Sequence, residues 1–100
     1  MQIATGSFPI GPVSGNGPQV NSTVVTMPAP VTQAVAILTG FTVEFTPNDD
    51  HHLGQLDVQV LQTSVNGASV TVQITYGLRD WSDNWDDSYD GQIFFAVVGE

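Results

Sequence analysis

The residues of this sequence that are best suited to chemistry lie in one acidic, aromatic stretch, residues 79–91. Five of the ten acidic residues of the chain fall within eleven positions of this stretch, interleaved with two tryptophans, a tyrosine and the only arginine. Crowded carboxylates repel one another unless solvent, a cation or the arginine relieves the repulsion. The stretch is therefore the first place to look for a ligand.

Aromatic rings beside hydrogen-bonding side chains are typical of a carbohydrate site. A ring stacks on the apolar face of a pyranose while polar groups bind the sugar hydroxyls. The candidate ligand-binding residues are Arg79, Asp80, Trp81, Trp85 and Tyr89. The alternative is that one tryptophan closes the end of the folded domain, whereas exposure of both indoles would favour binding.

Part of the same stretch matches the first half of a calcium-binding loop. Asp86, Ser88 and Asp90 supply oxygen ligands at the first, third and fifth positions, and Gly91 permits the sharp bend that follows. Position twelve is Val97 in place of the closing bidentate glutamate, which excludes a complete EF-hand loop. One prediction is a calcium loop completed by a distant carboxylate, and the other is a solvated acidic turn. Calcium is the cofactor that the sequence favours.

A second polar cluster, Asn48–His52, is a weaker candidate for a transition metal. Adjacent histidines on a strand point to opposite faces, so His51 and His52 rarely share one ion. A turn after Pro47 explains the segment more simply.

The charge balance limits the classes of partner. The formal net charge is -9, with one Lys or Arg in total against ten Asp and Glu. Because a surface that follows phosphates needs several cationic side chains, nucleic-acid binding is excluded, and docking on anionic lipid is disfavoured. Neutral molecules such as glycans, cations, or another copy of the chain fit better.

The chain has no cysteine, which rules out disulfides and thiolate metal sites. Residues 1–6 lack the basic start and long apolar run of a signal peptide. No stretch approaches the roughly 20 apolar residues of a membrane helix, so we expect no membrane insertion. These features fit a cytoplasmic, a virion-borne or an exported protein, and we expect an extracellular or virion surface.

Catalysis is not expected. There is no cysteine nucleophile and no serine in a recognisable nucleophile elbow. A pair of carboxylates for glycoside cleavage is the remaining possibility, but 100 residues leave little surface for a deep cleft.

The hydrophobic pattern predicts an all-β domain, a small antiparallel β-sandwich or barrel of about six or seven strands. Residues 1–22 read as a Gly/Pro-rich arm or loop, and residues 23–100 as the β-sandwich domain. Asn66-Gly67 predicts a tight hairpin turn. Residues 31–38 fit either a helix or a strand, and the β-branched residues favour a strand. The expected strands are Val20–Met27, Val31–Leu38, Phe41–Thr46, Leu56–Val60, Val70–Tyr76 and Ile93–Val98.

The last of these strands is apolar on both faces, which a strand in a two-layer sandwich does not need. Either loops cover its outer face, or that face meets another subunit. The second interpretation makes Phe94, Ala96 and Val98 candidate interface residues.

Three segments together resemble the H-type lectin domain. Pro30-Val31 leads into the strand Val35–Phe41, Leu56–Val60 precedes an alternating strand that ends in an aromatic loop, and Ile93–Val98 is similar to the closing strand of that family. The resemblance covers residues ~20–98 by pattern, without a diagnostic motif.

The resemblance implies a compact antiparallel sandwich that forms trimers or hexamers and binds sugars such as N-acetylgalactosamine. It would place Arg79, Asp80 and Trp81 near the family's aromatic sugar contacts. The sequence departs from the family between Ser14 and Gln19, where a sugar-binding carboxylate would be expected and none is present. We therefore expect a lectin-like binding module in a homo-oligomer of three or more chains. The alternative is a structural subunit of a coat, tail, fibre or appendage, with calcium as a stabilising ion.

Overall fold

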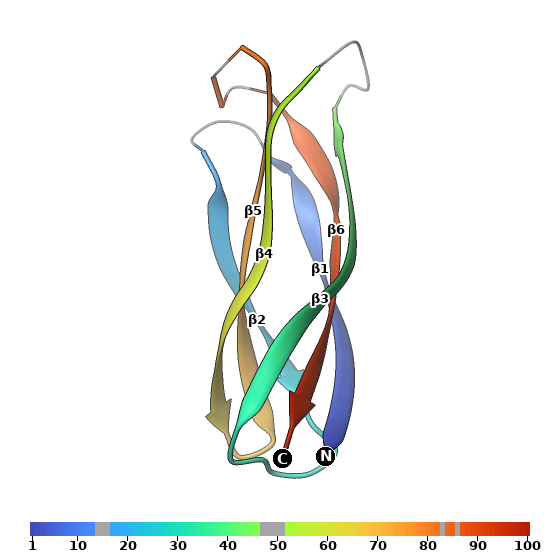
Figure 1. Cartoon of the computed structure of the whole chain (residues 1–100), viewed down its shortest axis with the longest axis vertical. Coiled ribbons are helices and arrows are strands. Elements are labelled where there is room, and N and C mark those ends of the chain that lie inside the picture. Colours follow the sequence, from blue (N-terminus) through green and yellow to red (C-terminus); the bar gives the residue numbers. More distant parts are fainter. Residues whose placement is uncertain (14–16, 47–51, 83, 86) are drawn as a thin grey trace.

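The computed structural model describes residues 1–13, 17–46, 52–82, 84–85 and 87–100, and these form two antiparallel sheets of three strands each (Figure 1). One sheet has the strand order β1–β6–β3 and the other β2–β5–β4. This confirms the predicted all-β sandwich. The strands are β1 (Gln2–Val13), β2 (Gln19–Thr26), β3 (Ala34–Phe45), β4 (Leu53–Asn66), β5 (Ser69–Asp80) and β6 (Tyr89–Gly99).

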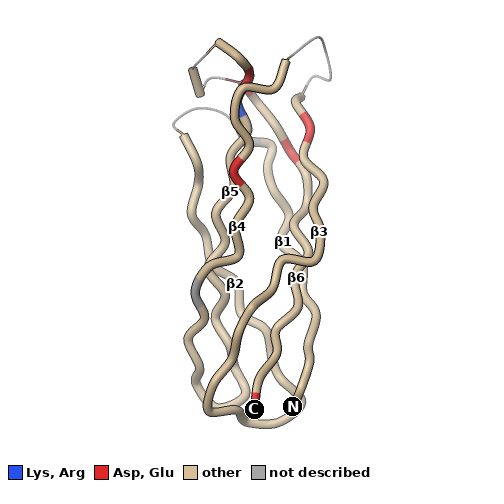
Figure 2. Tube along the Cα trace, viewed as in Figure 1, with Lys and Arg blue, Asp and Glu red and all other residues tan. Residues whose placement is uncertain are grey.

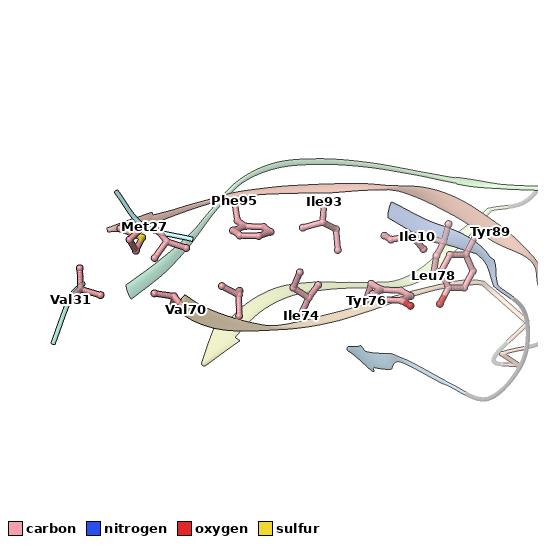
Figure 3. Close-up of a cluster of buried hydrophobic side chains, with 12 residues drawn as sticks. Ile10, Met27, Val31, Val70, Ile74, Tyr76, Leu78, Tyr89, Ile93 and Phe95 are labelled. Atoms are coloured by element: carbon pink, nitrogen blue, oxygen red, sulfur yellow. The ribbon is translucent and has the colours of Figure 1, made fainter. Parts of the chain in front are cut away.

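The two central strands, β5 and β6, build the core because their alternating apolar side chains face each other across the sandwich (Figure 3). Val70, Val72 and Ile74 of β5 are fully buried, as are Ile93 and Val97 of β6. Burying side chains of this size stabilises the fold by about 1.5–3 kcal/mol each. The buried apolar residues are Ile10, Met27, Val31, Val70, Val72, Ile74, Tyr76, Leu78, Tyr89, Ile93, Phe95 and Val97.

The hairpin between β4 and β5 forms at the predicted turn. Asn66 pairs with Ser69, and Gly67 between them has a φ of 64°. A positive φ at the first central position is what the type I′ and II′ hairpin turns require, and these turns follow the right-handed twist of the strands.

The connection between β2 and β3 closes one end of the sandwich. Met27 and Val31 are buried there, and their amides donate to the carbonyl oxygens of Ala68 and Gly67 at 2.7 and 3.0 Å. The connection thus joins the β4–β5 hairpin to the start of β3 and seals the core at that end.

The N-terminal segment differs from the sequence prediction of an arm or loop over residues 1–22. Residues 2–13 form β1, which pairs antiparallel with β6, and β2 begins at Gln19. Pro9 and Pro12 obscured the strand, but proline is compatible with an edge strand when its missing N–H would face away from the neighbour. Only one side of β1 is paired, so the prolines interrupt no ladder on the other side.

Of residues 31–38, ambiguous between helix and strand, residues 34–38 belong to β3, as favoured, and residues 31–33 precede it. The strand continues past Gly40 to Phe45, with a shift in its register to β6 between Leu38 and Gly40. A bulge of this kind lets one long strand follow the twist of the sheet.

Charge is distributed unevenly along a molecule that measures 46 × 19 × 17 Å (Figure 2). We call the end where β3 and β5 finish and β4 and β6 start the acidic end, and the opposite end the neutral end. Among the described acids, the acidic end carries Glu44, Asp57, Asp80, Asp87 and Asp90, and Glu100 alone lies at the neutral end. Arg79 also lies at the acidic end. No helix among the described residues is long and apolar enough to cross a membrane.

Gly91 allows β6 to lie close to β3, and this gives a test of the sheet geometry. A methyl group at Gly91 would overlap the Thr42 carbonyl oxygen and lie 2.8 Å from the Val43 Cα. Because both neighbours are backbone atoms, we expect Gly91→Ala to lower the free energy of unfolding by about 2–3 kcal/mol. Gly40→Ala is the control, since nothing lies within 4 Å of the added methyl. Urea denaturation of both variants measures the difference in their free energies of unfolding. Equal stabilities would contradict the close approach of β6 to its neighbour β3 at Gly91.

Candidate functional site

The loop after β5 folds back over the outer side of the β2–β5–β4 sheet, where Trp85 covers Gly77. A methyl group added at Gly77 would lie 3.1 Å from Cζ3 of Trp85 and 3.0 Å from Cα of Pro18. The guanidinium carbon of Arg79 lies 5.6 Å from the centroid of the Trp85 ring, within the range of a cation–π interaction. Arg79 and Trp85, two of the candidate ligand-binding residues, are therefore brought together, but Trp85 is half-buried and stacks on its own sheet.

Asp80 holds the turn that carries Trp81. Its Oδ1 accepts hydrogen bonds from the Ser82 amide, at 2.9 Å, and from the Ser82 hydroxyl. The Trp81 amide donates to the His52 carbonyl oxygen at 3.0 Å. This arrangement is an Asx turn, in which a carboxylate replaces a backbone acceptor. The Trp81 side chain extends from it with 70% of its surface exposed.

Tyr89 corrects one of the predicted ligand-binding positions. Its side chain points into the core and is 1% exposed, so it cannot reach a ligand on the surface. The reason is register: Tyr89 is the first residue of β6 and lies opposite Phe45, on the inward side of the alternation. Burial raises the pKa of the Tyr89 phenol, and the nearby Tyr76 phenol raises it further, while the Leu78 backbone lowers it.

The buried phenol predicts a loss of stability at alkaline pH. Because the pKa is higher in the folded protein than the ordinary 10.0, the neutral form is favoured. This contribution is fully present below pH 10 and is lost as the pH rises through the folded-state pKa. We expect Tyr89→Phe to reduce this loss, measured by urea denaturation between pH 8 and pH 11.

The same variant should cost little at pH 7, because no described group meets hydrogen-bond geometry with the Tyr89 hydroxyl. The matched control is Tyr76→Phe. The Tyr76 hydroxyl accepts a hydrogen bond from Asn21 Nδ2 at 2.8 Å, so its removal should cost about 1 kcal/mol. A Tyr89→Phe protein as alkali-sensitive as the wild type would show that another group controls the transition.

The predicted calcium ligands are only partly placed. Asp86 lies outside the described residues. The Ser88 hydroxyl shares a hydrogen bond of 2.8 Å with the Thr46 hydroxyl. Asp90 lies directly opposite Glu44 in the β3–β6 ladder, a like-charge pair that the sequence could not reveal because it depends on register. The described residues contain no group of three or more His, Cys, Asp or Glu positioned for a metal, and calcium stays a prediction.

The second predicted metal segment can be placed only at its end. Asn48, Asp49, Asp50 and His51 lie outside the described residues. His52 is exposed, and its carbonyl oxygen is the acceptor for the Trp81 amide. It therefore takes part in supporting the Trp81 turn.

The candidate interface residues Phe94, Ala96 and Val98 all lie on the outward side of β6. They alternate with the buried Ile93, Phe95 and Val97. The neighbouring strands extend this surface in two cross-strand rows, Ile3–Val98–Val35 and Thr5–Ala96–Ile37. We call the outward side chains of Ile3, Val35, Ile37, Phe94, Ala96 and Val98 the apolar face.

Sequence reasoning missed Ile3, Val35 and Ile37 as members of this face. The signal was period two in residues 2–8 and 34–38, where inward Ala4, Ala34 and Ala36 alternate with larger outward side chains. An inward alanine hides this alternation, because the larger apolar side chain then points to solvent.

Among the described residues, the outer side of the other sheet carries charge at Asp57 and Arg79 towards the acidic end, and is uncharged towards the neutral end. A shallow hollow of about 470 Å³ crosses all three strands there, from Val20 and Ser22 of β2, over Thr71 and Gln73 of β5, to Ser64 of β4. The two outer surfaces of the sandwich therefore differ, one apolar and the other hydroxyl-rich.

Comparisons with known proteins found no relative: no family model, no curated protein sequence and no solved structure matches the chain. They do not bear on the resemblance to H-type lectins, which stays a prediction.

Proposed function

We propose that this chain is a non-catalytic structural module that assembles with copies of itself through the apolar face. The exposure of that face carries the proposal. Ile3, Val35 and Ile37 are 57%, 63% and 50% exposed, and Phe94 is 39% exposed although it lies on a central strand. Contiguous exposed apolar side chains of this kind mark contact surfaces in soluble proteins.

The absence of charge on this face supports a second copy as the partner. The cross-strand rows that contain the apolar face hold only apolar residues, Thr5, Ser7 and Gly40. The described acids near this face lie beyond its two ends: Glu100 two residues after Val98, and Glu44 and Asp90 towards the acidic end. Two copies related by a two-fold axis across the strands would bring the apolar faces together with the acidic ends pointing in opposite directions.

The size of the face predicts how strong this contact is. With strands about 4.8 Å apart and a rise of about 3.3 Å per residue, the face covers roughly 300 Å². A pair then buries roughly 600–700 Å² in total, below the ~1,200 Å² of stable specific complexes. One such contact is weak and reversible, and stable assembly needs further contacts.

A trimer or larger ring is constrained by the acidic ends. A rotation axis parallel to the strands would gather several acidic ends in one place, where their repulsion favours cation binding. Calcium at the acidic end would relieve that repulsion, so a calcium requirement would accompany a parallel ring and not a two-fold pair.

Substitution on the face tests the proposal. Ile37→Gln replaces an exposed apolar side chain with an uncharged polar one, and should shift sedimentation velocity profiles of concentrated protein towards the monomer. Leu61→Gln is the matched control, because Leu61 is 46% exposed on β4 and lies outside the face. An unchanged Ile37→Gln profile, or a wild type that stays monomeric at all concentrations, would contradict assembly through this face.

Glycan binding is the second candidate, and the exposure of Trp81 favours it. The indole is held by the Asp80 turn with Asn84 nearby, whose Nδ2 donates to the Ser82 carbonyl oxygen at 3.5 Å. An exposed ring on a turn held by hydrogen bonds, beside amide and hydroxyl groups, suits stacking on a neutral sugar. The site would consist of Trp81 with the polar side chains of its turn, and Trp85 would support it from behind.

The glycan candidate has a direct test. Trp81→Ala should abolish retention on immobilised glycans while leaving the thermal melt unchanged, since the ring is 70% exposed. Leu53→Ala controls for loss of any exposed apolar group at the acidic end, because Leu53 is 63% exposed and pairs with Asp80. Equal retention of Trp81→Ala and the wild type, or no retention of the wild type, would remove a sugar site from this turn.

A further inference from the structure

Strand β2 is an edge of its sheet and has few of the features that protect edges. It pairs with β5 on one side, and no described strand pairs with the other (Figure 1). Its sequence, QVNSTVVT, contains no proline and no charged residue. An unprotected edge presents N–H and C=O groups that can pair with another strand.

The other three edges are protected. On one side of the sandwich, β3 lies beside β4, and the Thr63 hydroxyl donates to the Ala34 carbonyl oxygen at 2.7 Å. On the other side, β1 contains Pro9 and Pro12, and near its start the Gln2 side chain accepts a hydrogen bond from the Ala29 amide at 2.9 Å. The contrast singles out β2.

The outward side chains of β2 are self-complementary. Val20 and Val24 are 56% and 60% exposed on the outer side of the sheet, and they lie two residues before and two after Ser22. In an antiparallel pair with a two-fold axis at Ser22, each Val20 lies opposite Val24 of the second copy. Two β-branched pairs would then cover the exposed valines, a cross-strand combination that stabilises antiparallel sheets.

From these observations we infer that β2 pairs antiparallel with β2 of a second copy, joining two three-stranded sheets into one continuous six-stranded sheet with Ser22 at the two-fold axis. Backbone hydrogen bonds supply the affinity, as in other cases of strand addition. The Val20–Val24 spacing fixes the register.

Charge also favours a second copy in this orientation. β2 runs from the acidic end at Gln19 to the neutral end at Thr26. Antiparallel pairing therefore places the acidic end of one copy beside the neutral end of the other. The molecule is 46 Å long, so the two acidic ends are separated by much more than the ~8 Å over which charges interact at physiological salt.

This surface is distinct from the apolar face and lies on the other sheet, so edge pairing requires no contact through that face. A chain with both surfaces would make two different contacts, which supplies the additional buried area that the apolar face alone lacks.

Cysteine cross-linking tests the register, because the chain has no cysteine of its own. In Ser22→Cys, the two introduced thiols would face each other across the axis at a Cα separation of about 4.5–5.5 Å, which a disulfide can span. Mild oxidation should convert this variant to a covalent dimer at least tenfold faster than Thr26→Cys. Thr26 is also exposed on β2, but its two copies would lie about 26 Å apart.

A mixing experiment tests the valine pairs. Val20→Cys carrying a mass tag, mixed with untagged Val24→Cys, should cross-link mainly between unlike chains, since like positions would be about 13 Å apart. Equal rates for Ser22→Cys and Thr26→Cys, or random cross-linking in the mixture, would overturn the inference.

Both measurements are repeated in variants that also carry Ile37→Gln. Retained cross-linking supports an independent edge contact, whereas its loss would show that β2 approaches its copy only through the apolar face and would overturn the inference.

Discussion

The packing of β5 against β6 is the constraint on which the rest of this structure depends. Each is the central strand of its sheet, and their inward side chains form the middle of the core. The remaining strands attach to one of these two and bury mainly smaller or partly covered residues. Phe95 shows how tightly the inner side of one sheet is filled, since its ring lies over Gly6 of the neighbouring strand β1, where a methyl group would come within 2.8 Å of Cε2 and closer still to Cζ. Because the inward positions are fixed in this way, the outward positions of the same strands are fixed as well, including every residue of the apolar face on β6.

Much of the fold could be predicted from the sequence because alternation of apolar residues is a local signal. It identified the strands from Val20 onwards and the hairpin at Asn66-Gly67. The prediction failed where the apolar alternation was weak, or where a residue's position depended on the register between two strands. Glycine and proline obscured β1. Gly6 stands at one of its inward positions, so the apolar alternation is interrupted there. Tyr89 was assigned to a surface loop because a sequence does not show at which residue a loop becomes a strand. The opposition of Glu44 and Asp90 arises only when β3 and β6 are aligned, and no local pattern contains that information.

The separation of charged and neutral ends links the two proposed surfaces. The formal charge of -9 would oppose close approach of two copies if it were spread evenly. Among the described acids, all but Glu100 lie at the acidic end, which leaves the β1–β6–β3 face and the β2 edge free of charge over most of their length (Figure 2). Both surfaces then favour neighbours that point in opposite directions. The acidic end, where Trp81 is exposed, would remain accessible in such an arrangement, so assembly and ligand binding at that end are compatible.

The neighbours β1 and β6 are the first and last strands of this chain, and Gln2 lies directly beside Gly99. A ribosome that synthesises the chain completes β1 long before β6, so β1 lacks its hydrogen-bonding neighbour until β6 has been made. The β1–β6–β3 sheet cannot grow in chain order, because its central strand arrives last. Closing so long a loop of chain is entropically costly, and folds dominated by such contacts form slowly. The nascent chain must therefore keep its early strands soluble until β6 is made. The scarcity of long apolar runs before β6 helps it to do so.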